Sequence, residues 1–173
     1  MSTISINALK KESTDMDEKS LKKYLTGLYA GEILASMDYS QAYDESNKYH
    51  LSEETADHLQ EHFGEETEHA VLLRKEIESR GWYEYIPMRE LRQISIPPAT
   101  TLGGPTTEKY ILNYFIEAER DAIEAYSNCI EKIKDGTFED AENTEGLLKI
   151  LEGIKRDEEE HKRDFEDILR RRY

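Results

Sequence analysis

The chain has 173 residues, of which 37% are hydrophobic and 35% are charged. Its formal net charge of −15 excludes nucleic acid as the main partner, because binding to phosphates needs clustered lysine and arginine side chains. The single cysteine, Cys129, excludes an intrachain disulfide and favours a reducing, cytoplasmic location. No stretch approaches the roughly 18 apolar residues that span a bilayer, so we expect no membrane association.

Four long helices are expected after a polar tail at residues 1–17, and together they predict an all-α domain. The helices are expected at about residues 17–46, 52–81, 107–136 and 144–173. The second begins at Ser52, a good N-cap, and stops at Gly81. Each helix would be roughly 40 Å long at 1.5 Å per residue.

The connections between these helices differ in length. Residues 47–51 and 137–142 are short and join antiparallel neighbours, whereas residues 82–106 hold all four prolines and the Gly103-Gly104 pair. At roughly 3.3 Å per residue the long segment can run the length of the helices. Residues 18–173 are therefore predicted to form a four-helix bundle of two antiparallel hairpins joined by a long crossover.

Each helix carries an apolar stripe that acidic residues interrupt at its middle. In the fourth helix the stripe runs through Leu147, Leu151, Ile154, Glu158, His161, Phe165 and Ile168. Glu158 and His161 are therefore expected to face inward, and Glu159 and Glu160 to face water. In the second helix, Phe63, Ala70 and Ile77 are expected to widen the stripe.

The interruptions form an internal repeat. Glu32 in the first helix matches Glu119 in the third, and Glu66-x-x-His69 matches Glu158-x-x-His161. The Glu-x-x-His spacing alone is weak in so acidic a chain. Its position at the middle of an apolar stripe, on corresponding helices of two similar hairpins, makes it informative.

Four carboxylates in a bundle core need compensating charge, because each isolated ion costs several kcal/mol to bury. Two divalent cations would cancel four carboxylates, and two neutral imidazoles would complete the coordination. Carboxylate and imidazole ligands suit iron, with manganese as the alternative. The sequence therefore predicts a site for two metal ions, with the ligands Glu32, Glu66, His69, Glu119, Glu158 and His161.

The segments AGEILASMDY, EETEH, EAERDAIEAY and RDEEEH resemble the ferritin-like superfamily, nearest to bacterioferritins and the bacterioferritin-related Dps-like proteins. The resemblance covers about residues 20–172. It implies that Glu32 and Glu119 are terminal ligands, that Glu66 and Glu158 bridge two iron ions, and that His69 and His161 supply the nitrogen ligands. It also places tyrosines beside the metals, seven residues after a ligand glutamate.

The chain also departs from these families. Thr67 stands where bacterioferritin has its haem-binding methionine, so haem is not expected, and little chain remains for the short fifth helix of 24-subunit ferritins. Dps-like proteins often carry a cysteine pair, whereas this chain has Cys129 alone. Ala122 replaces a glutamate that rubrerythrins usually add, and the rubredoxin-like Cys-x-x-Cys pairs are missing.

Three functions remain open at this stage. The first is a ferroxidase that oxidises Fe(II) with O2 or H2O2 in iron storage, detoxification and protection from oxidative stress. The second is a rubrerythrin-like peroxidase that stores no mineral, and the third is a metal-free structural bundle. The enzymes are expected as homo-oligomers, either a dimer or a dodecameric cage.

Individual side chains carry further expectations. Tyr39 and Tyr126 either assist catalysis, by holding a carboxylate or donating an electron, or are core tyrosines. His62 is expected at the periphery, with an extra-ligand or access-path role as the alternative. His58 and His50 are expected on the surface, and Cys129 is expected to be a small core residue.

Overall fold

The computed structural model describes residues 20–82 and 105–173. The predicted tail at residues 1–17 and nearly all of the predicted crossover lie outside the described residues. The helices are α2 (Leu21–Asp44), α3 (Ser46–Tyr49), α4 (Glu53–Ser79), α6 (Pro105–Lys134) and α7 (Glu145–Arg172). The described part of the chain contains no strand, which confirms the all-α class.

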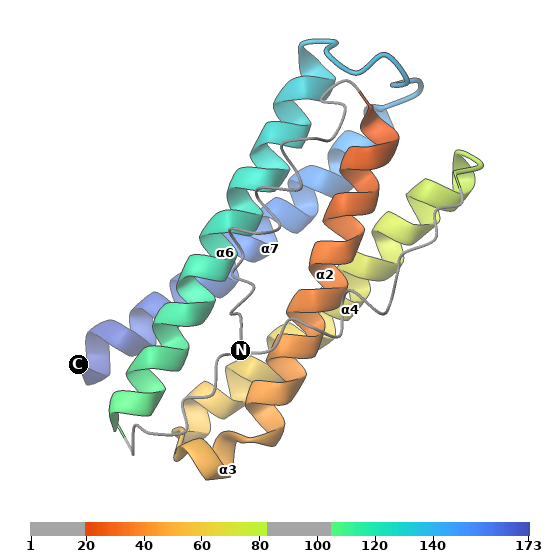
Figure 1. Cartoon of the computed structure of the whole chain (residues 1–173). Coiled ribbons are helices and arrows are strands. Elements are labelled where there is room, and N and C mark those ends of the chain that lie inside the picture. Colours follow the sequence, from red (N-terminus) through yellow and green to blue (C-terminus); the bar gives the residue numbers. More distant parts are fainter. Residues whose placement is uncertain (1–19, 83–104) are drawn as a thin grey trace, which may run out of the picture.

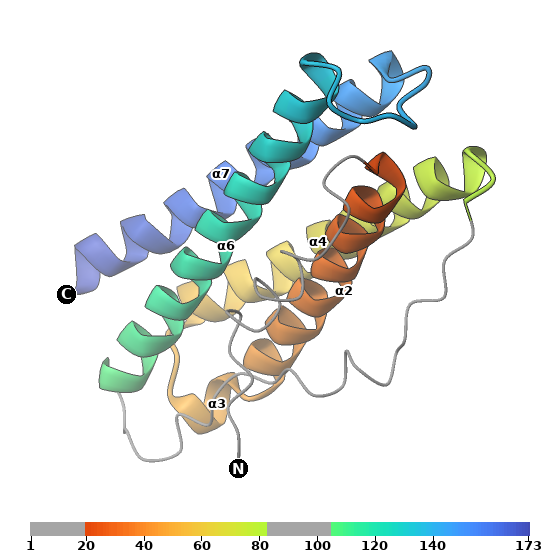
Figure 2. The ribbon, with the colours of Figure 1, turned by 45° about the horizontal axis from the view of Figure 1, so that its top comes forward.

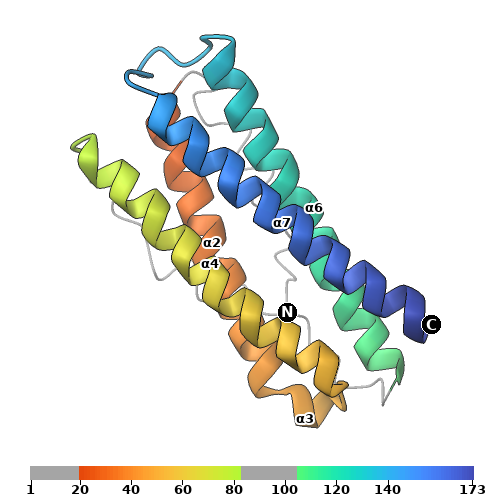
Figure 3. The same cartoon turned by 180° about the vertical axis from the view of Figure 1, so that it is seen from behind.

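The four long helices form an elongated bundle of two antiparallel hairpins (Figure 1). Helix α2 packs mainly on α4, and α6 packs mainly on α7, as the turned view in Figure 2 shows. Helices α4 and α7 lie side by side on the face seen from behind (Figure 3), and α2 and α6 lie on the opposite face. The predicted pair of hairpins is therefore confirmed.

The helix ends follow the capping residues that the sequence predicts. The Ser52 side chain accepts a hydrogen bond from the Thr55 backbone N–H and caps the first turn of α4. Gly81 and Gly136 follow α4 and α6 with positive φ values of 68° and 75°, a conformation that glycine adopts without steric cost.

The first predicted helix differs from the structure at its C-terminus. We predicted one helix as far as residue 46, whereas α2 ends at Asp44 and the short helix α3 follows. His50 ends α3 in the left-handed conformation, with a φ of 55°. The extra turn buries Tyr49 against the core, which explains why the chain does not pass straight into α4.

The apolar core consists of two clusters, one toward each end of the bundle. The first cluster gathers the start of α2, the end of α4, the end of α6 and the start of α7, with Leu25, Leu73 and Leu151 fully buried. The second gathers the opposite ends of the same helices around Phe115 and Phe165. The charged residues that interrupt the stripes lie between the two clusters.

The predicted stripes match the buried faces with one clear exception. Phe63 was expected to widen the stripe of α4, but its side chain is exposed. Among residues 20–82 and 105–173, no helix combines the length and hydropathy required to cross a lipid bilayer.

Candidate metal centre

The structure brings the six residues of the predicted metal site together in the middle of the bundle. All six residues are buried, each with at most 4% of its surface exposed. They come from all four long helices and are Glu32, Glu66, His69, Glu119, Glu158 and His161. Burial of four carboxylates at one level of a small domain requires compensating positive charge.

Their ligand atoms form two overlapping groups of four. Within each group, one ligand atom from every residue lies within 4.8 Å of the others. The first group holds Glu32, Glu66, His69 and Glu158, and the second holds Glu66, Glu119, Glu158 and His161. Because Glu66 and Glu158 belong to both groups, the geometry fits two adjacent cations that share two carboxylates.

The Nδ1 atoms of both histidines face the carboxylates. His69 Nδ1 lies 3.3 Å from both Glu32 Oε2 and Glu158 Oε1. His161 Nδ1 lies 3.1 Å from Glu66 Oε1 and 3.5 Å from Glu158 Oε2. Each imidazole therefore presents one nitrogen to a different group of four.

The opposite ring nitrogens contact carboxylates outside the two groups. His161 Nε2 donates to Glu65 Oε2 at 2.7 Å, and His69 Nε2 donates to Asp157 Oδ2 at 3.3 Å. Since an ionised carboxylate only accepts, the proton belongs on Nε2 in both rings. These contacts orient the rings and leave Nδ1 as the atom that can bind a cation.

Two tyrosine hydroxyls hold the remaining carboxylates across the bundle. Tyr39 on α2 donates to Glu119 Oε1 on α6, and Tyr126 on α6 donates to Glu32 Oε1 on α2. Burial, together with the neighbouring carboxylates, raises the pKa of both phenols well above the usual value. Both hydroxyls therefore stay protonated, and each fixes one glutamate so that its other oxygen is available.

Burial and mutual repulsion shift the ionisation of the carboxylates. Burial, and next the charge of Glu158, raise the pKa of Glu66 and of Glu119 well above the usual value. Burial opposes ionisation of Glu158 as well, but its contacts with His161 and His69 outweigh burial and lower its pKa. Protons thus replace part of the missing positive charge when no metal ion is bound.

The histidine ligands carry another part of that positive charge. Burial disfavours protonation of His69, but its contacts with Glu158 and Glu32 raise its pKa to about 10. A bound cation would displace this proton from Nδ1, because a ligand nitrogen must be deprotonated.

Several buried polar atoms in this centre make no hydrogen bond of good geometry. Five of them, within the part of the chain that the structure describes, have no hydrogen-bond partner: Glu32 Oε2, Glu66 Oε1, His69 Nδ1, Glu158 Oε1 and His161 Nδ1. Buried polar atoms normally have a partner, and all five belong to the predicted ligands. The donor set therefore fits the two metal ions that the sequence predicts.

Two histidines differ from their predicted positions. His62, expected at the periphery, is 2% exposed and lies beside the centre, with its ring centroid 4.0 Å from that of His161. His58, expected on the surface, is half-buried, with 26% of its side chain exposed. The sequence did contain a sign of this, because His62 falls in the apolar stripe of α4.

Cys129 is a core residue, as predicted. Its side chain is fully buried, and burial raises the pKa of the thiol to about 12. The thiol therefore stays protonated at neutral pH, and a reactive thiolate is not expected.

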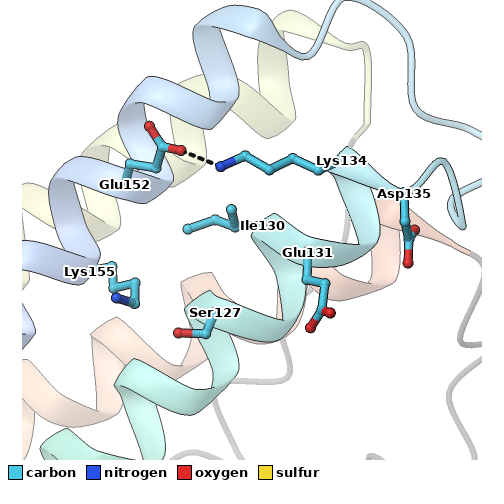
Figure 4. A pocket seen from close by; sticks show the side chains of 7 residues that line it. All are labelled: Ser127, Ile130, Glu131, Lys134, Asp135, Glu152 and Lys155. Atoms are coloured by element: carbon cyan, nitrogen blue, oxygen red, sulfur yellow. Dashed lines mark hydrogen bonds and ion pairs between the residues drawn. The ribbon is translucent and has the colours of Figure 1, made fainter.

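A surface pocket between α6 and α7 does not coincide with the centre. It measures about 530 Å³ and is lined by side chains that include Ser127, Glu131 and Lys155. Figure 4 shows the pocket and the ion pair between Lys134 and Glu152, whose charged atoms lie 2.7 Å apart. It contains none of the six predicted ligands and is therefore separate from the candidate metal centre.

The fold and the carboxylate-rich centre together define a protein with the ferritin-like four-helix-bundle fold. The resemblance to the ferritin-like superfamily is thereby confirmed for the fold. Among solved structures, the chain is similar to a dodecameric thioferritin, the bacterioferritin-related protein from Bacteroides fragilis, with a TM-score of 0.67 and 21% sequence identity. The similarity covers 95% of this chain and 93% of that chain. No family model and no curated protein match the sequence.

Proposed function

We propose that this protein is a ferroxidase that binds two Fe(II) ions per chain and oxidises them with O2 or H2O2. The observation that carries the proposal is the pair of overlapping ligand groups that share Glu66 and Glu158. A single mononuclear site would not explain why four carboxylates and two histidines are buried at the same level. We further propose that the six predicted residues are the iron ligands, with Mn(II) as the alternative ion.

The reaction that we propose is a two-electron oxidation in which iron is the substrate. Two Fe(II) ions each lose one electron, and one H2O2 molecule with two protons takes up both electrons to yield two water molecules. With O2 as the oxidant, the same two electrons and two protons yield H2O2. A paired site supplies both electrons at once, which a mononuclear Fe(II) site does not.

The protein contributes charge, position and exclusion of water. The shared carboxylates of Glu66 and Glu158 would hold the two ions side by side, while Glu65 and Asp157 keep the histidine Nδ1 atoms directed at them. The apolar clusters on both sides of the centre keep bulk water away, which strengthens the electrostatic interactions within it.

We extend the proposal to a homo-oligomer that stores or detoxifies iron, because the similar structure is a dodecamer. A rubrerythrin-like peroxidase would use the same buried ligands without storing mineral. The assembly and the amount of iron retained after oxidation distinguish these two roles.

The proposed activity is tested by anaerobic Fe(II) binding followed by addition of O2 or H2O2. We expect about two Fe(II) ions per chain and a rise in the ultraviolet absorbance of Fe(III) that is faster than in buffer. Glu66→Gln should lose both effects, because it removes a carboxylate that belongs to both ligand groups. The matched control is Glu68→Ala, an exposed glutamate on the same helix, which should behave like the wild type.

Either of two results would overturn the proposal. One is a wild-type oxidation rate equal to that of buffer, and the other is a Glu66→Gln variant that remains folded and fully active. Light scattering together with iron analysis tests the storage role. A closed assembly that retains many iron ions per chain supports storage, whereas a dimer that retains about two supports the peroxidase.

A further inference from the structure

A second group of metal-binding side chains lies beside the buried centre, between α4 and α7. His58 and His62 lie one turn apart on α4, and Asp164 faces them from α7. We infer that these three residues form a third site, which binds a single divalent cation. The site shares no ligand with the two groups of four described above.

The distances fit a mononuclear site. The three ligand atoms lie within 4.8 Å of one another. His58 Nδ1 lies 3.6 Å from Asp164 Oδ2, and His62 Nε2 lies 3.8 Å from the same oxygen. Two ligands bound about 2.1 Å from a cation lie at most about 4.2 Å apart, so both separations are compatible with one shared ion.

The contacts of His62 show that its Nε2 atom acts as an acceptor. Its Nδ1 atom contacts Glu65 Oε2 at 3.3 Å, and that carboxylate oxygen can only accept. The ring proton therefore lies on Nδ1, which leaves a lone pair on Nε2.

This lone pair faces another acceptor. His62 is 2% exposed, and its Nε2 atom has no hydrogen-bond partner in residues 20–82 and 105–173. Asp164 Oδ2, the oxygen that it faces, also carries lone pairs. Two acceptors directed at each other repel unless a positive charge lies between them. At 3.8 Å the two atoms are too far apart to share a proton in a hydrogen bond, whereas a metal ion bound to both would fit between them.

The second histidine also directs a ring nitrogen at Asp164. His58 Nδ1 is buried and unpaired among the described residues, and it also faces Asp164 Oδ2. Glu61 Oε2 lies 3.9 Å from the same nitrogen and can supply a further oxygen. Two imidazoles and a carboxylate with open positions suit Fe(II), Zn(II) and related ions better than Ca(II) or Mg(II).

The site connects the surface with the buried centre. The side chains of His58 and Asp164 are 26% and 31% exposed, so an ion can reach them from solvent. Glu65 Oε2 contacts both His62 Nδ1 and His161 Nε2, and thereby joins the third site to a predicted ligand of the paired ions. If the proposed function is right, Fe(II) is the natural ion of this site and binds here before it moves to the buried centre.

Zinc provides a redox-inert probe of the full-length protein. Equilibrium dialysis should give about three Zn(II) ions per chain, and crystals grown with Zn(II) should show anomalous density between His58, His62 and Asp164. His58→Gln and Asp164→Asn should each lose this ion and retain the paired ions. The control His50→Asn removes an exposed imidazole at a left-handed position that asparagine tolerates, and should retain all ions.

The outcomes separate this inference from the proposed function. Density at the paired site alone, or His58→Gln that binds as many ions as the wild type, would disprove the third site and leave the paired site intact. Glu66→Gln that loses the paired ions but keeps the ion at His58 would establish the third site as independent. Wild-type protein that binds no zinc at either place would overturn both.

Discussion

The two halves of the candidate metal centre have matching predicted ligands but different surroundings. Glu66-x-x-His69 on α4 corresponds to Glu158-x-x-His161 on α7, and Tyr39 corresponds to Tyr126. Tyr126 belongs to a mainly aliphatic cluster that contains Leu28, Leu73 and Ile154. Tyr39 instead contacts rings, with Phe115 at 4.3 Å, His62 at 5.7 Å and Phe165 at 6.1 Å between centroids.

The difference is sharpest at the position one turn before each shared glutamate. His62 occupies that position on α4, whereas α7 has the buried Ile154. One further turn away, His58 corresponds to Ile150, and Asp164 corresponds to Leu72 on α4. All three ligands of the inferred third site therefore replace apolar residues of the other half.

This comparison separates two kinds of buried polar residue. The repeated carboxylates and histidines partly compensate one another's charge, and in the proposed function two ions complete them. His58, His62 and Asp164 have no polar counterpart in the other half. They need a separate charged or hydrogen-bonding partner, because a buried imidazole without such a partner destabilises the fold. Three sets of substitutions test this distinction, and a fourth tests a contact between the hairpins at the end of the bundle.

Ile154→His should have the largest effect, because it places an imidazole where the other half has no Asp164 to share a cation with it. We expect the free energy of unfolding to fall by about 2 to 5 kcal/mol, from lost apolar burial and an unpaired polar group. Urea denaturation measures this loss. Ile154→Val is the control, with an expected cost of about 1 kcal/mol, and equal costs for both variants would contradict the comparison.

Tyr39→Phe and Tyr126→Phe should have the next largest effect, and the two variants should lose similar amounts of stability. Each removes a hydroxyl that donates to a buried glutamate of the other hairpin. The metal-free protein should lose about 1 to 3 kcal/mol in either variant, because one buried acceptor loses its donor. Tyr43→Phe, at an exposed tyrosine, serves as the control in the same urea titrations. Clearly unequal losses would show that the two halves do not hold their terminal carboxylates equivalently.

His62→Leu should have the opposite sign, because it gives α4 the apolar side chain that α7 already has. The metal-free protein should gain about 1 to 2 kcal/mol, because the buried Nε2 atom without a partner is removed, while Glu65 is exposed enough for water to replace its lost contact with Nδ1. The same variant should lose the part of the zinc-induced rise in melting temperature that comes from the third site. A destabilised metal-free variant would argue that His62 is a satisfied core residue rather than a ligand.

The two hairpins also contact each other at both ends of the bundle. At each end, an acidic residue of the second hairpin caps the N-terminus of a helix in the first hairpin, α4 at one end and α2 at the other. Glu108 accepts hydrogen bonds at 2.8 Å from both Ser52 N and Thr55 Oγ1, and Asp140 accepts one from Leu21 N at 2.6 Å. Burial opposes ionisation of Glu108, but hydrogen bonds from Ser52, Tyr173 and Thr55 outweigh it and lower its pKa to about 2.

Glu108→Gln should therefore have the smallest effect, and one that depends on pH. The folded pKa lies below the unfolded value of about 4.3, so the stabilising contribution is complete above that pH and is lost as the pH falls toward 2. We expect a cost of about 1 kcal/mol at pH 7 that shrinks below pH 4. Melting temperatures of the wild type and the variant from pH 7 to pH 3 measure the difference. A cost that stays constant over this range would contradict the role of an ionised Glu108.

The fold could be predicted because the stripes on all four helices repeat with helical spacing. The long stripe of α7 placed Glu158 and His161 inward correctly, since apolar residues flank them on both sides. The turn at α3 could not be predicted, because the burial of Tyr49 depends on contacts with residues remote in sequence. Phe63 was misplaced for a related reason, since α4 meets its neighbours over a narrower face than its apolar residues suggested.

The inferred third site could not be predicted from the sequence alone. His58 and His62 are visible as a pair four residues apart, but Asp164 lies about a hundred residues further along the chain. Only the packing of α4 against α7 brings this carboxylate to the two imidazoles.

The sequence by itself determined the number of long helices, most of each buried face and the six charged or imidazole side chains that interrupt those faces. These features follow from local spacing along single helices, where a residue's neighbours are three and four positions away. The tertiary structure alone decided which carboxylates belong to both ligand groups and which ring nitrogen of each histidine faces the centre. It also decided that His62 is buried beside His161. Those features depend on how antiparallel helices align against one another, and that alignment follows from packing across the whole bundle.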